Sequence, residues 1–538
     1  MKKNHLWSKM RMTLLTVPVL FCGLFLASCA QDGFDNDEKW ESSVSNTQMT
    51  SPVASKVEIA PDATGNYQIV SWPVVLGASG YECRLVDVTD PDKQKTLFSE
   101  VVDGCSFKAP REDDCVYEVY IKTLGNKEKN NADAKETTKL EYNTIIKTEA
   151  TIPSGSDLTT WFANITIPDN EKDAVTKQLI PLAYDLEANG SYTMSGTVDF
   201  GFHKIMIRTQ KKKADGSIVK ASENAIITLQ GAPDAAEGEE ATETTGKTCF
   251  LLQHGFTLKN VNVDCTSMTG EALLLMHAAD GISDKIKFNH DVYPYAGDKN
   301  IYLLEEPIEV RNCMIKNLKK SLLGTNATKW GLTSLNIINN IIQLDNCSKN
   351  VLNFNYKDVN NAAPKNLLVQ NNTIYDLDGT NSVYFIQLSH PSGAYKIFVP
   401  NQDPPKNTLV YEVSNNTFIQ TFRKQYFGNN VAPNKCVHNV VKNNIFIDVW
   451  LVTKYALSSQ DRTISNTYQW MIKGWGDNDV KTQPKDDKEN GLIFEDPGIT
   501  EPTTALDLTK ENGGLTGLTP SGGALSNKAG DPRWLPTE

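Results

Sequence analysis

Acidic residues near position 376 are the first group in this sequence that could do chemistry. Residues 376–381 read Asp-Leu-Asp-Gly-Thr-Asn, which places carboxylate, hydroxyl and amide oxygens close together. Calcium prefers oxygen ligands of this kind, so Asp376 and Asp378 are candidate ligands of a calcium ion. A tight turn without metal is the alternative, because Asp-Gly pairs favour chain reversals.

Three basic residues could accept a proton from a substrate. Lys316 and Lys320 follow one asparagine-containing segment, and Arg423 follows another. A lysine or arginine can act as a base where its surroundings favour the neutral form. Each position is also consistent with a solvated surface charge, so the sequence offers candidates for a catalytic base without selecting one.

Aromatic residues in the long polar segments could bind a sugar. Sugars place their apolar faces on aromatic rings, while amides and charges hold the hydroxyl groups. Packing in a core is the alternative for each ring. The candidates are Tyr293, Trp330, Tyr395, Tyr426 and Trp475.

The amino terminus resembles a bacterial lipoprotein signal. Residues 1–28 contain four basic residues and no acidic one, and the apolar run over residues 13–26 is too short for a comfortable membrane span. The run ends in Leu-Ala-Ser-Cys at residues 26–29, which resembles a lipoprotein box whose Cys29 thiol takes the lipid. We therefore expect residues 1–28 to be a signal peptide. An ordinary cleaved signal with a chance cysteine is the alternative.

An acidic stretch follows the lipidation candidate and belongs to a polar tether over residues 29–52. Residues 30–38 resemble the surface-export signal of Bacteroidota-type lipoproteins, and a solvated linker is the alternative. The resemblance implies an outer-membrane protein that is anchored in the membrane through Cys29 and faces the cell exterior.

Composition narrows the function classes. The chain has 538 residues and a formal net charge of −12, which becomes −16 once residues 1–28 are removed. Such an acidic protein is a poor ligand for phosphates, so we expect no nucleic-acid partner. Eight of the ten cysteines lie outside the signal and Cys29, without a CxxC spacing that would indicate zinc. Buried thiols and one or two disulfides both remain open.

Residues 53–150 are expected to form a small antiparallel β-sandwich. Short apolar runs alternate there with turn signals, and residues 67–72 alternate so that Trp72 can face a core. The stretch from Ser71 to Tyr81 resembles the second-to-third strand region of a fibronectin type III domain. We expect Trp72 and Tyr81 to be core residues rather than platforms for a ligand.

An asparagine repeat dominates residues 151–538. Its leading asparagines are Asn312, Asn339, Asn371, Asn415 and Asn443, with a degenerate first copy at Asn260, and the steps between copies are 27 to 52 residues. Asparagine tolerates the left-handed conformation that a sharp bend between strands needs. In coils stacked about 4.8 Å apart, equivalent amides could hydrogen-bond as a ladder.

This signature resembles the right-handed parallel β-helix of the pectin-lyase-like proteins. The segment from Phe494 to Trp534 is similar to the C-terminal segment of uncharacterised lipoproteins of that group, and residues 174–186 are expected to be a capping helix. The predicted fold class is all-β, with an N-terminal fibronectin type III-like β-sandwich followed by a right-handed parallel β-helix and a C-terminal cap segment.

The resemblance also implies a chemistry. Enzymes of this fold cut acidic glycans by β-elimination, with a lysine or arginine as base and usually a calcium ion. Hydrolases of the fold need clustered aspartates, whereas the two Asp-Asp pairs, at 113–114 and 486–487, lie in polar loops. We therefore discount a hydrolase, and no lyase motif selects a catalytic residue.

The leading hypothesis is a non-enzymatic surface lipoprotein that binds a polysaccharide, with pectin among the candidates, for glycan capture. An outer-membrane glycan uptake receptor is its expected partner. A polysaccharide lyase acting on uronic-acid glycans is the second hypothesis, and an adhesion or structural surface protein is the third. Calcium is the only cofactor candidate.

Overall fold

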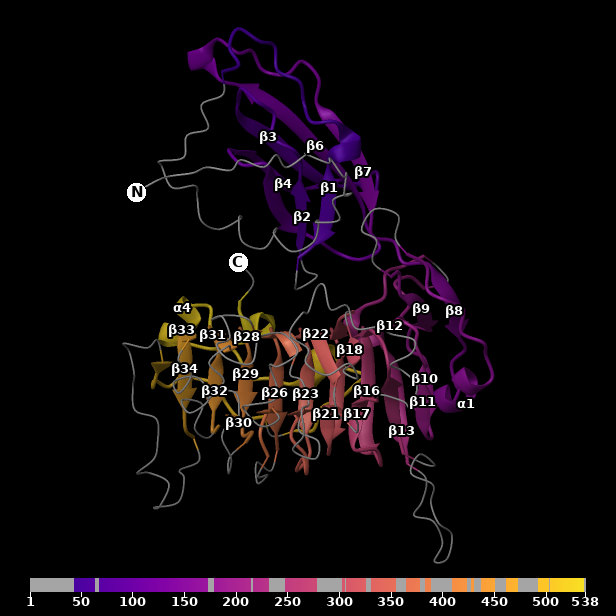
Figure 1. Ribbon diagram of the computed structural model, residues 1–538. Helices are drawn as coiled ribbons and strands as arrows, with labels where there is room; N and C mark the ends of the chain where they lie inside the picture. The colour runs from indigo at the N-terminus through magenta and orange to yellow at the C-terminus, as the bar shows by residue number, and fades with distance from the viewer. Residues whose placement is uncertain are drawn as a thin grey trace, which may run out of the picture. The chain divides into compact units, whose positions relative to one another are not determined.

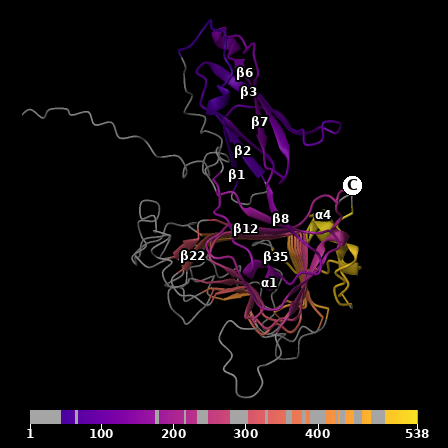
Figure 2. The ribbon, with the colours of Figure 1, turned by 90° about the vertical axis from the view of Figure 1, so that its right-hand side faces the viewer.

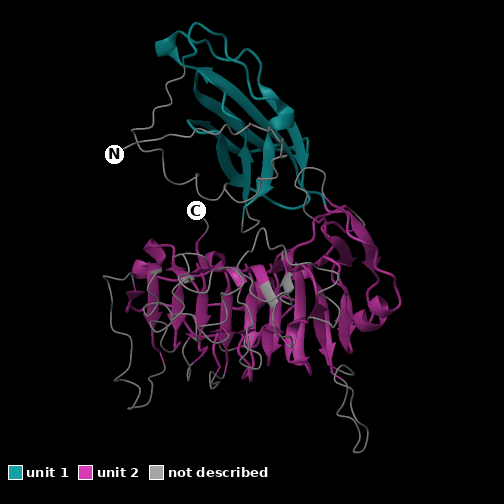
Figure 3. Ribbon diagram, viewed as in Figure 1, with its two compact units in different colours: residues 1–145 teal, residues 146–538 magenta. Residues whose placement is uncertain are grey.

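The structure is a computed structural model that describes residues 43–62, 67–172, 179–213, 216–231, 247–277, 302–304, 306–325, 330–354, 364–377, 383–388, 409–422, 427–429, 437–449, 461–472, 492–502 and 504–536. The chain forms two compact units, residues 1–145 and 146–538 (Figure 3). Strands account for nearly all the regular structure in the described residues, so the predicted all-β class is confirmed.

Unit 1 is a sandwich of two antiparallel sheets. One sheet has the order β1 (Glu58–Pro61), β2 (Tyr67–Ser71), β5 (Ser106–Pro110). The other has the order β4 (Lys95–Val102), β3 (Ala78–Asp87), β6 (Val116–Gly125), β7 (Thr138–Asn143). The single-turn helices η1 (Ala54–Lys56) and η2 (Lys127–Lys129) complete the unit.

The core of unit 1 contains both aromatic residues that the sequence assigned to it. Trp72 and Tyr81 are buried, and their rings meet edge to face with centroids 5.2 Å apart. The Tyr81 hydroxyl accepts the Val75 N–H at 2.9 Å, which ties the chain before β3 to the core. The prediction that these rings serve packing is confirmed.

Unit 2 consists of three parallel sheets in the described part of the chain (Figure 1). The first sheet contains β8 (Thr148–Ile152), β9 (Leu182–Leu186), β12 (Ile205–Thr209), β15 (Phe256–Lys259), β18 (Tyr302–Leu304), β19 (Ile308–Arg311), β22 (Trp330–Ile338), β25 (Pro364–Gln370), β28 (Leu409–Ser414), β31 (Val437–Lys442) and β33 (Asp461–Ser465). The second contains β10 (Ser191–Met194), β13 (Ala225–Gln230), β16 (Val261–Ser267), β20 (Met314–Leu318), β23 (Ile341–Leu344), β26 (Thr373–Asp376), β29 (Thr417–Ile419), β32 (Ile445–Ile447), β34 (Thr467–Trp470) and β35 (Leu492–Ile493). The third contains β11 (Thr197–Asp199), β14 (Cys249–Leu252), β17 (Ala272–Met276), β21 (Ser321–Thr325), β24 (Leu352–Asn353), β27 (Ile386–Gln387) and β30 (Gly428–Asn429).

The chain visits the three sheets in a fixed order and so winds into stacked coils. β12, β13 and β14 form one coil, and β15, β16 and β17 form the next, with each strand parallel to its counterpart. Side chains alternate along each strand, so one set faces an apolar interior that runs the length of the stack. The predicted parallel β-helix is confirmed, and Figure 2 shows it along the stack.

A single asparagine turns the chain from the first sheet into the second. Asn312, Asn339, Asn371, Asn415 and Asn443 all have a φ between 53° and 58°. The residues that precede four of them, Ile338, Gln370, Ser414 and Lys442, are direct partners on neighbouring strands, so the bends lie in register. Asparagine is suited to this left-handed conformation because its short side chain meets little steric hindrance there.

The longer column of hydrogen-bonded amides runs one residue after the bends. Asn340, Asn372 and Asn416 donate from Nδ2 to Oδ1 of the next asparagine, over 3.0, 2.9 and 3.0 Å, and Asn444 ends the column. All four side chains are fully buried. Among the leading asparagines, side-chain hydrogen bonds run from Asn312 Nδ2 to Asn260 Oδ1 at 3.0 Å and from Asn339 Nδ2 to Asn312 Oδ1 at 2.7 Å. Over most of its length, the ladder therefore runs through the residue after each leading asparagine and not through the leading asparagine itself.

Cys313 occupies the column position before Asn340. Its thiol donates to the carbonyls of Arg311 and Leu258, at 3.2 and 3.5 Å. Asn372 donates to the equivalent two carbonyls two coils later, those of Gln370 and Ile337. Burial raises the pKa of the Cys313 thiol to about 12. The thiol therefore substitutes for an amide in the column.

The first coil is closed by a short helix, α1 (Leu158–Ala163), which lies across the near end of the stack in Figure 2. Asp157 caps it by accepting the Thr160 N–H at 2.9 Å. Phe162 packs against Tyr184 and Phe200, with ring centroids 5.0 Å away in each case. The capping helix predicted at residues 174–186 is wrong where the structure describes it, because the apolar run 182–186 forms β9 inside the stack.

Replacing Asn372 by alanine should lower the free energy of unfolding by about 3 kcal/mol, because it removes the side-chain donor to the Ile337 and Gln370 carbonyls and the acceptor of the Asn340 backbone N–H. Asn371→Gly changes the adjacent residue and should cost no more than about 1 kcal/mol, because glycine adopts the same positive φ. Urea unfolding followed by circular dichroism measures both. Equal losses in the two variants would contradict the assignment of the column to Asn372.

Cys313→Asn should leave the stability within about 1 kcal/mol of the parent chain, since the amide can reach the same two carbonyls and extend the column. Cys313→Val should be the less stable variant by about 1 kcal/mol or more, because valine leaves those carbonyls unpaired. Thermal unfolding midpoints rank the pair. A valine variant more stable than the asparagine variant would show that the thiol does not act as an amide substitute.

Candidate functional site

The outer face of the second sheet is covered by the chain itself. Residues 494–536, the C-terminal strap, contain η6 (Glu511–Gly514), α4 (Gly522–Ser526) and η7 (Pro532–Trp534) and lie outside the stack (Figure 2). Strap residues Leu506, Leu515 and Trp534 pack with Ile341, Tyr375, Ile445 and other residues of the sheet in an apolar cluster separate from the interior. This face is therefore not available to a ligand.

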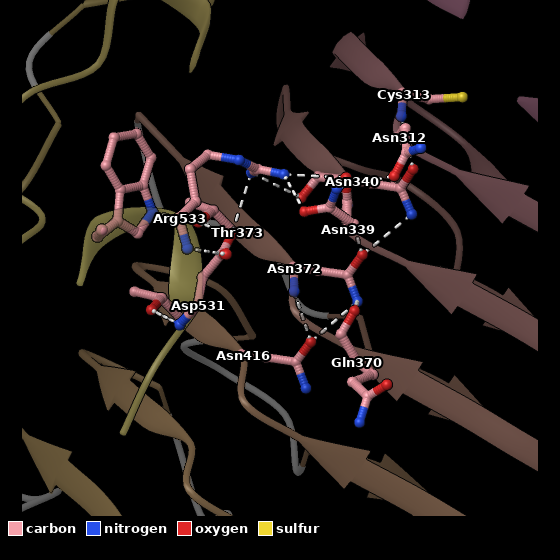
Figure 4. A network of polar contacts seen from close by, with 12 residues as sticks. Asn312, Cys313, Asn339, Asn340, Gln370, Asn372, Thr373, Asn416, Asp531 and Arg533 are labelled. Carbon is pink, nitrogen blue, oxygen red and sulfur yellow. Dashed lines mark hydrogen bonds and ion pairs between the residues drawn. The ribbon is translucent and has the colours of Figure 1, made fainter. Parts of the chain in front are cut away.

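A polar latch fixes the end of the strap to the asparagine bends (Figure 4). The Arg533 guanidinium donates to the carbonyl and the Oδ1 of Asn339, at 2.9 and 2.7 Å. Asp531 accepts the Thr373 hydroxyl at 2.8 Å and pairs with Arg533 at 3.1 Å. The Trp534 indole N–H donates to the same Thr373 oxygen at 2.7 Å.

The latch is a buried ion pair. Burial raises the pKa of Asp531 and lowers the pKa of Arg533, so desolvation opposes both charges. Their mutual attraction and the hydrogen bonds to Asn339 and Thr373 offset that cost. A pair of this kind is sensitive to the loss of one partner, because the remaining charge stays buried.

The outer face of the first sheet carries charges that are already paired. Arg208 donates to Asp185 at 2.7 Å, and Arg311 donates to Glu309 at 2.8 Å, within one strand. Further along the sheet, Lys442 pairs with Glu412 at 3.0 Å. Each of these three cations is therefore balanced by a carboxylate beside it.

The outer face of the third sheet carries a row of amides. The pairing of β24, β27 and β30 places Asn353, Gln387 and Asn429 at one register position on neighbouring strands. Leu352 and Ile386, which precede two of them, are fully buried in the interior. Alternation along a strand therefore directs Asn353 and Gln387 away from the interior, about 4.8 Å apart. Asn353 is half-buried, whereas Gln387 is buried and its Nε2 donates to the Leu388 carbonyl at 2.7 Å.

The same row is apolar in the earlier coils. Leu251 pairs with Leu275, which in turn pairs with Gly324. The face thus changes from two half-buried leucines, through a glycine without a side chain, to amides. Apolar surface beside hydrogen-bonding amides is the combination that sugar rings require, since each ring has an apolar face and a rim of hydroxyl groups.

Titratable groups border this row where the third-sheet strands end. Lys204 donates to Glu306 at 2.7 Å and to the Leu179 carbonyl at 2.7 Å. His254 accepts the Gly255 N–H on Nδ1 at 2.8 Å, and burial, with a contribution from Lys204, lowers its pKa. His254 is therefore neutral near pH 7 with its proton on Nε2. The sequence analysis did not single out His254 or Glu306.

At the amino ends of the same strands lies a row of lysines around one glutamate. Lys349 pairs with Glu271 at 3.1 Å, and Lys320 lies 3.8 Å from the other oxygen of the same carboxylate. Burial opposes ionisation of Glu271, but the hydrogen bond from Lys349 and the nearby lysines hold the pKa of the carboxyl below its usual range. The third sheet is therefore bordered by charge at both ends of its strands.

The candidate bases do not come together. Lys316 lies in the second sheet, where it pairs in register with Asp264, whereas Lys320 precedes the third-sheet strand β21. Arg423 lies outside the described residues. Lys320 is consequently the one member of the predicted set that the described structure places beside the amide row.

The structure describes one of the two candidate calcium ligands. Asp376 ends β26 and is almost completely buried, while Asp378 lies outside the described residues. Within the described ranges, no group of three histidine, cysteine, aspartate or glutamate side chains could hold a metal ion. Calcium binding at Asp376 and Asp378 stays a prediction.

Most of the aromatic candidates also lie outside the described residues, namely Tyr293, Tyr395, Tyr426 and Trp475. Trp330 begins β22, and its side chain is likewise not described. Chain order nevertheless relates them to the third sheet. In the sequence, Tyr293 follows β17, Trp330 follows β21 and Tyr395 follows β27.

The remaining sequence features concern cysteine and the membrane. Cys29 lies outside the described residues, and its lipidation stays a prediction. Cys83, Cys105, Cys115, Cys249, Cys265, Cys313 and Cys347 are free thiols. Over the ranges that the structure describes, no helix is long and apolar enough to cross a membrane.

Comparisons with known proteins give families without an assigned function. Residues 1–189 match DUF4992, a domain of unknown function, and residues 190–377 match DUF4957, another domain of unknown function. No curated protein matches the chain. Among solved structures, the pectate lyase PelI from Erwinia chrysanthemi, in complex with tetragalacturonic acid, is similar with 10% identity over 79% of this chain and 86% of that one. The TM-score is 0.16, so the fold assignment rests on the strand pairing itself.

Two ion pairs of the strap should differ in how much they contribute to the free energy of unfolding. Arg533→Met should lower the free energy of unfolding by about 3 to 5 kcal/mol, because it leaves Asp531 charged and buried. Lys510→Met, which removes an exposed partner of Asp507, should cost less than about 1 kcal/mol. Urea unfolding, with limited proteolysis of the strap, compares them. Similar small losses in both variants would show that the latch does not hold the strap.

Proposed function

We propose that this chain is a polysaccharide-binding protein whose ligand lies along the outer face of the third sheet. The observation that carries the proposal is the half-buried Asn353 at the register position that the half-buried Leu251 and Leu275 occupy on earlier coils. A chain of sugars can contact each successive coil because the sheet repeats every ~4.8 Å. In the described residues, the strap covers apolar side chains of the second sheet, and three cations of the first sheet are paired with carboxylates.

The same proposal includes the setting of the binding face. Cys29 would carry the lipid that anchors the protein in an outer membrane, facing the exterior, and residues 29–52 would be the tether. Unit 1, with its sheets of β1-β2-β5 and β4-β3-β6-β7, would be a fibronectin type III-like spacer. An outer-membrane uptake receptor would receive the captured glycan.

The contacts of Lys204 and His254 favour binding over cleavage. A β-eliminating lyase needs a base with a free electron pair beside the substrate. Lys204 is paired with Glu306, and the His254 Nδ1 already accepts a backbone N–H. Both groups are therefore already engaged in contacts within the chain. The second candidate function is a lyase for uronic-acid glycans, favoured by the position of His254 two residues after the third-sheet strand β14.

The amide row predicts a loss of glycan affinity in an Asn353→Ala variant. An amide hydrogen bond to a sugar hydroxyl contributes about 0.5 to 1.5 kcal/mol, so affinity should fall about two- to tenfold. Gln370→Met is the matched control, because Gln370 is a half-buried amide on the first sheet that donates to Ser414 at 3.3 Å. Affinity electrophoresis and calorimetry with plant glycans measure the change, and thermal unfolding checks that each variant folds.

Two outcomes would count against the proposal. An equal loss in the Gln370 control would mean that the third sheet is not the binding face. Release of unsaturated products that absorb in the ultraviolet, with or without added calcium, would replace the binding function by the lyase.

A further inference from the structure

Four charged residues occupy one register position along the third sheet. The pairing of Phe250 with Leu274 places Lys247 beside Glu271, three residues earlier. The pairing of Ala272 with Ser321 places Glu271 beside Lys320. By the same register, Leu323 with Leu352 places Lys320 beside Lys349. The result is a column of lysine, glutamate, lysine and lysine on four successive coils, which we call the lysine row.

The backbone under the lysine row is held by buried groups. The Cys347 thiol donates to the carbonyls of Lys320 and Lys349, at 3.0 and 3.1 Å, and so ties two neighbouring coils together. Ser321, also buried, donates to the Asn350 carbonyl at 2.7 Å. These bonds fix where the two lysines leave the stack, so only their side chains remain to be ordered by a ligand.

The charges of the lysine row do not cancel. Three lysines surround one carboxylate, which leaves a local excess of positive charge in a chain whose net charge is −12. The exposed fractions of the Lys349 and Glu271 side chains are 46% and 54%, so solvent reaches the row. By contrast, each of the arginines Arg208 and Arg311 on the first sheet has a carboxylate directly beside it. The lysine row therefore contains more positive than negative side chains.

We infer that the lysine row binds the oxyanion substituents, carboxylate or sulfate, of an acidic glycan. This inference rests on the proposed function and names the class of glycan. The row lies at the amino ends of the strands that carry Leu251, Leu275 and Asn353, so a glycan on that face passes beside it. Ammonium groups about 4.8 Å apart can each meet a substituent on a sugar chain lying along the stack. Glu271 competes with the ligand for Lys320 and Lys349.

The test uses three oligosaccharides of equal length: an oligogalacturonate for the carboxylate, a sulfated galactan oligomer for the sulfate and a neutral cello-oligosaccharide. The triple variant Lys247→Gln, Lys320→Gln, Lys349→Gln should lose about tenfold or more in affinity for whichever acidic probe the parent chain prefers. Its affinity for the neutral probe should stay unchanged. Binding of the acidic probe by the parent chain should also weaken as salt rises, since exposed charges are screened over ~10 Å at 0.1 M.

Two further variants separate a ligand site from a general charge effect. Lys211→Gln, Lys212→Gln, Lys220→Gln removes the same charge from exposed lysines between β12 and β13, and should leave all affinities unchanged. Glu271→Gln should raise the affinity for the acidic probe, because it frees two lysines; a merely structural glutamate would not produce a gain. Calorimetry measures the affinities.

The outcomes distinguish this inference from the function on which it rests. Neutral and acidic probes that bind the parent chain equally, or an acidic probe that binds the triple variant as well as the parent, would overturn the lysine row and leave glycan binding intact. Failure of the parent chain to bind any glycan would overturn both. Preference for the carboxylate or the sulfate probe identifies the substituent.

Discussion

Every part of unit 2 depends on hydrogen bonds between parallel strands of successive coils. Those bonds form only if each coil turns at the same place, and the turn from the first to the second sheet is one residue with a positive φ. Asparagine at that residue accepts the strained backbone, and the buried amide that follows satisfies the carbonyls exposed by the bend. Repetition of this pair keeps the strands in register over the coils from Asn339-Asn340 to Asn443-Asn444.

Register then determines what each outer face presents. A residue type that is repeated at one position of successive coils forms a row along the stack. The rows on the three sheets differ in residue type. The second sheet carries apolar side chains that the strap covers, with Arg533 bonded to a bend asparagine. The first sheet carries mutually paired charges. The third carries leucines and amides with lysines beside them, and it is the face suited to a long, regular ligand.

The sequence predicted the parts of the fold that recur. The asparagine copies revealed the coils, and the alternation around Trp72 revealed a buried ring in unit 1. The sequence misplaced the capping helix, because the apolar run of β9 has no signal that separates a buried strand from a helix. The helix that forms is the shorter α1, which Asp157 caps. It also missed the lysine row, because Lys247, Glu271, Lys320 and Lys349 become neighbours only through a register that spans segments of unequal length.

A crystal structure with a bound oligosaccharide tests whether a glycan lies on the third sheet. Sugar density is expected along the outer face of β14, β17, β21, β24 and β27, with a hydroxyl group on Asn353. Ordered sugar on the first sheet, beside Arg208 and Arg311, would contradict it.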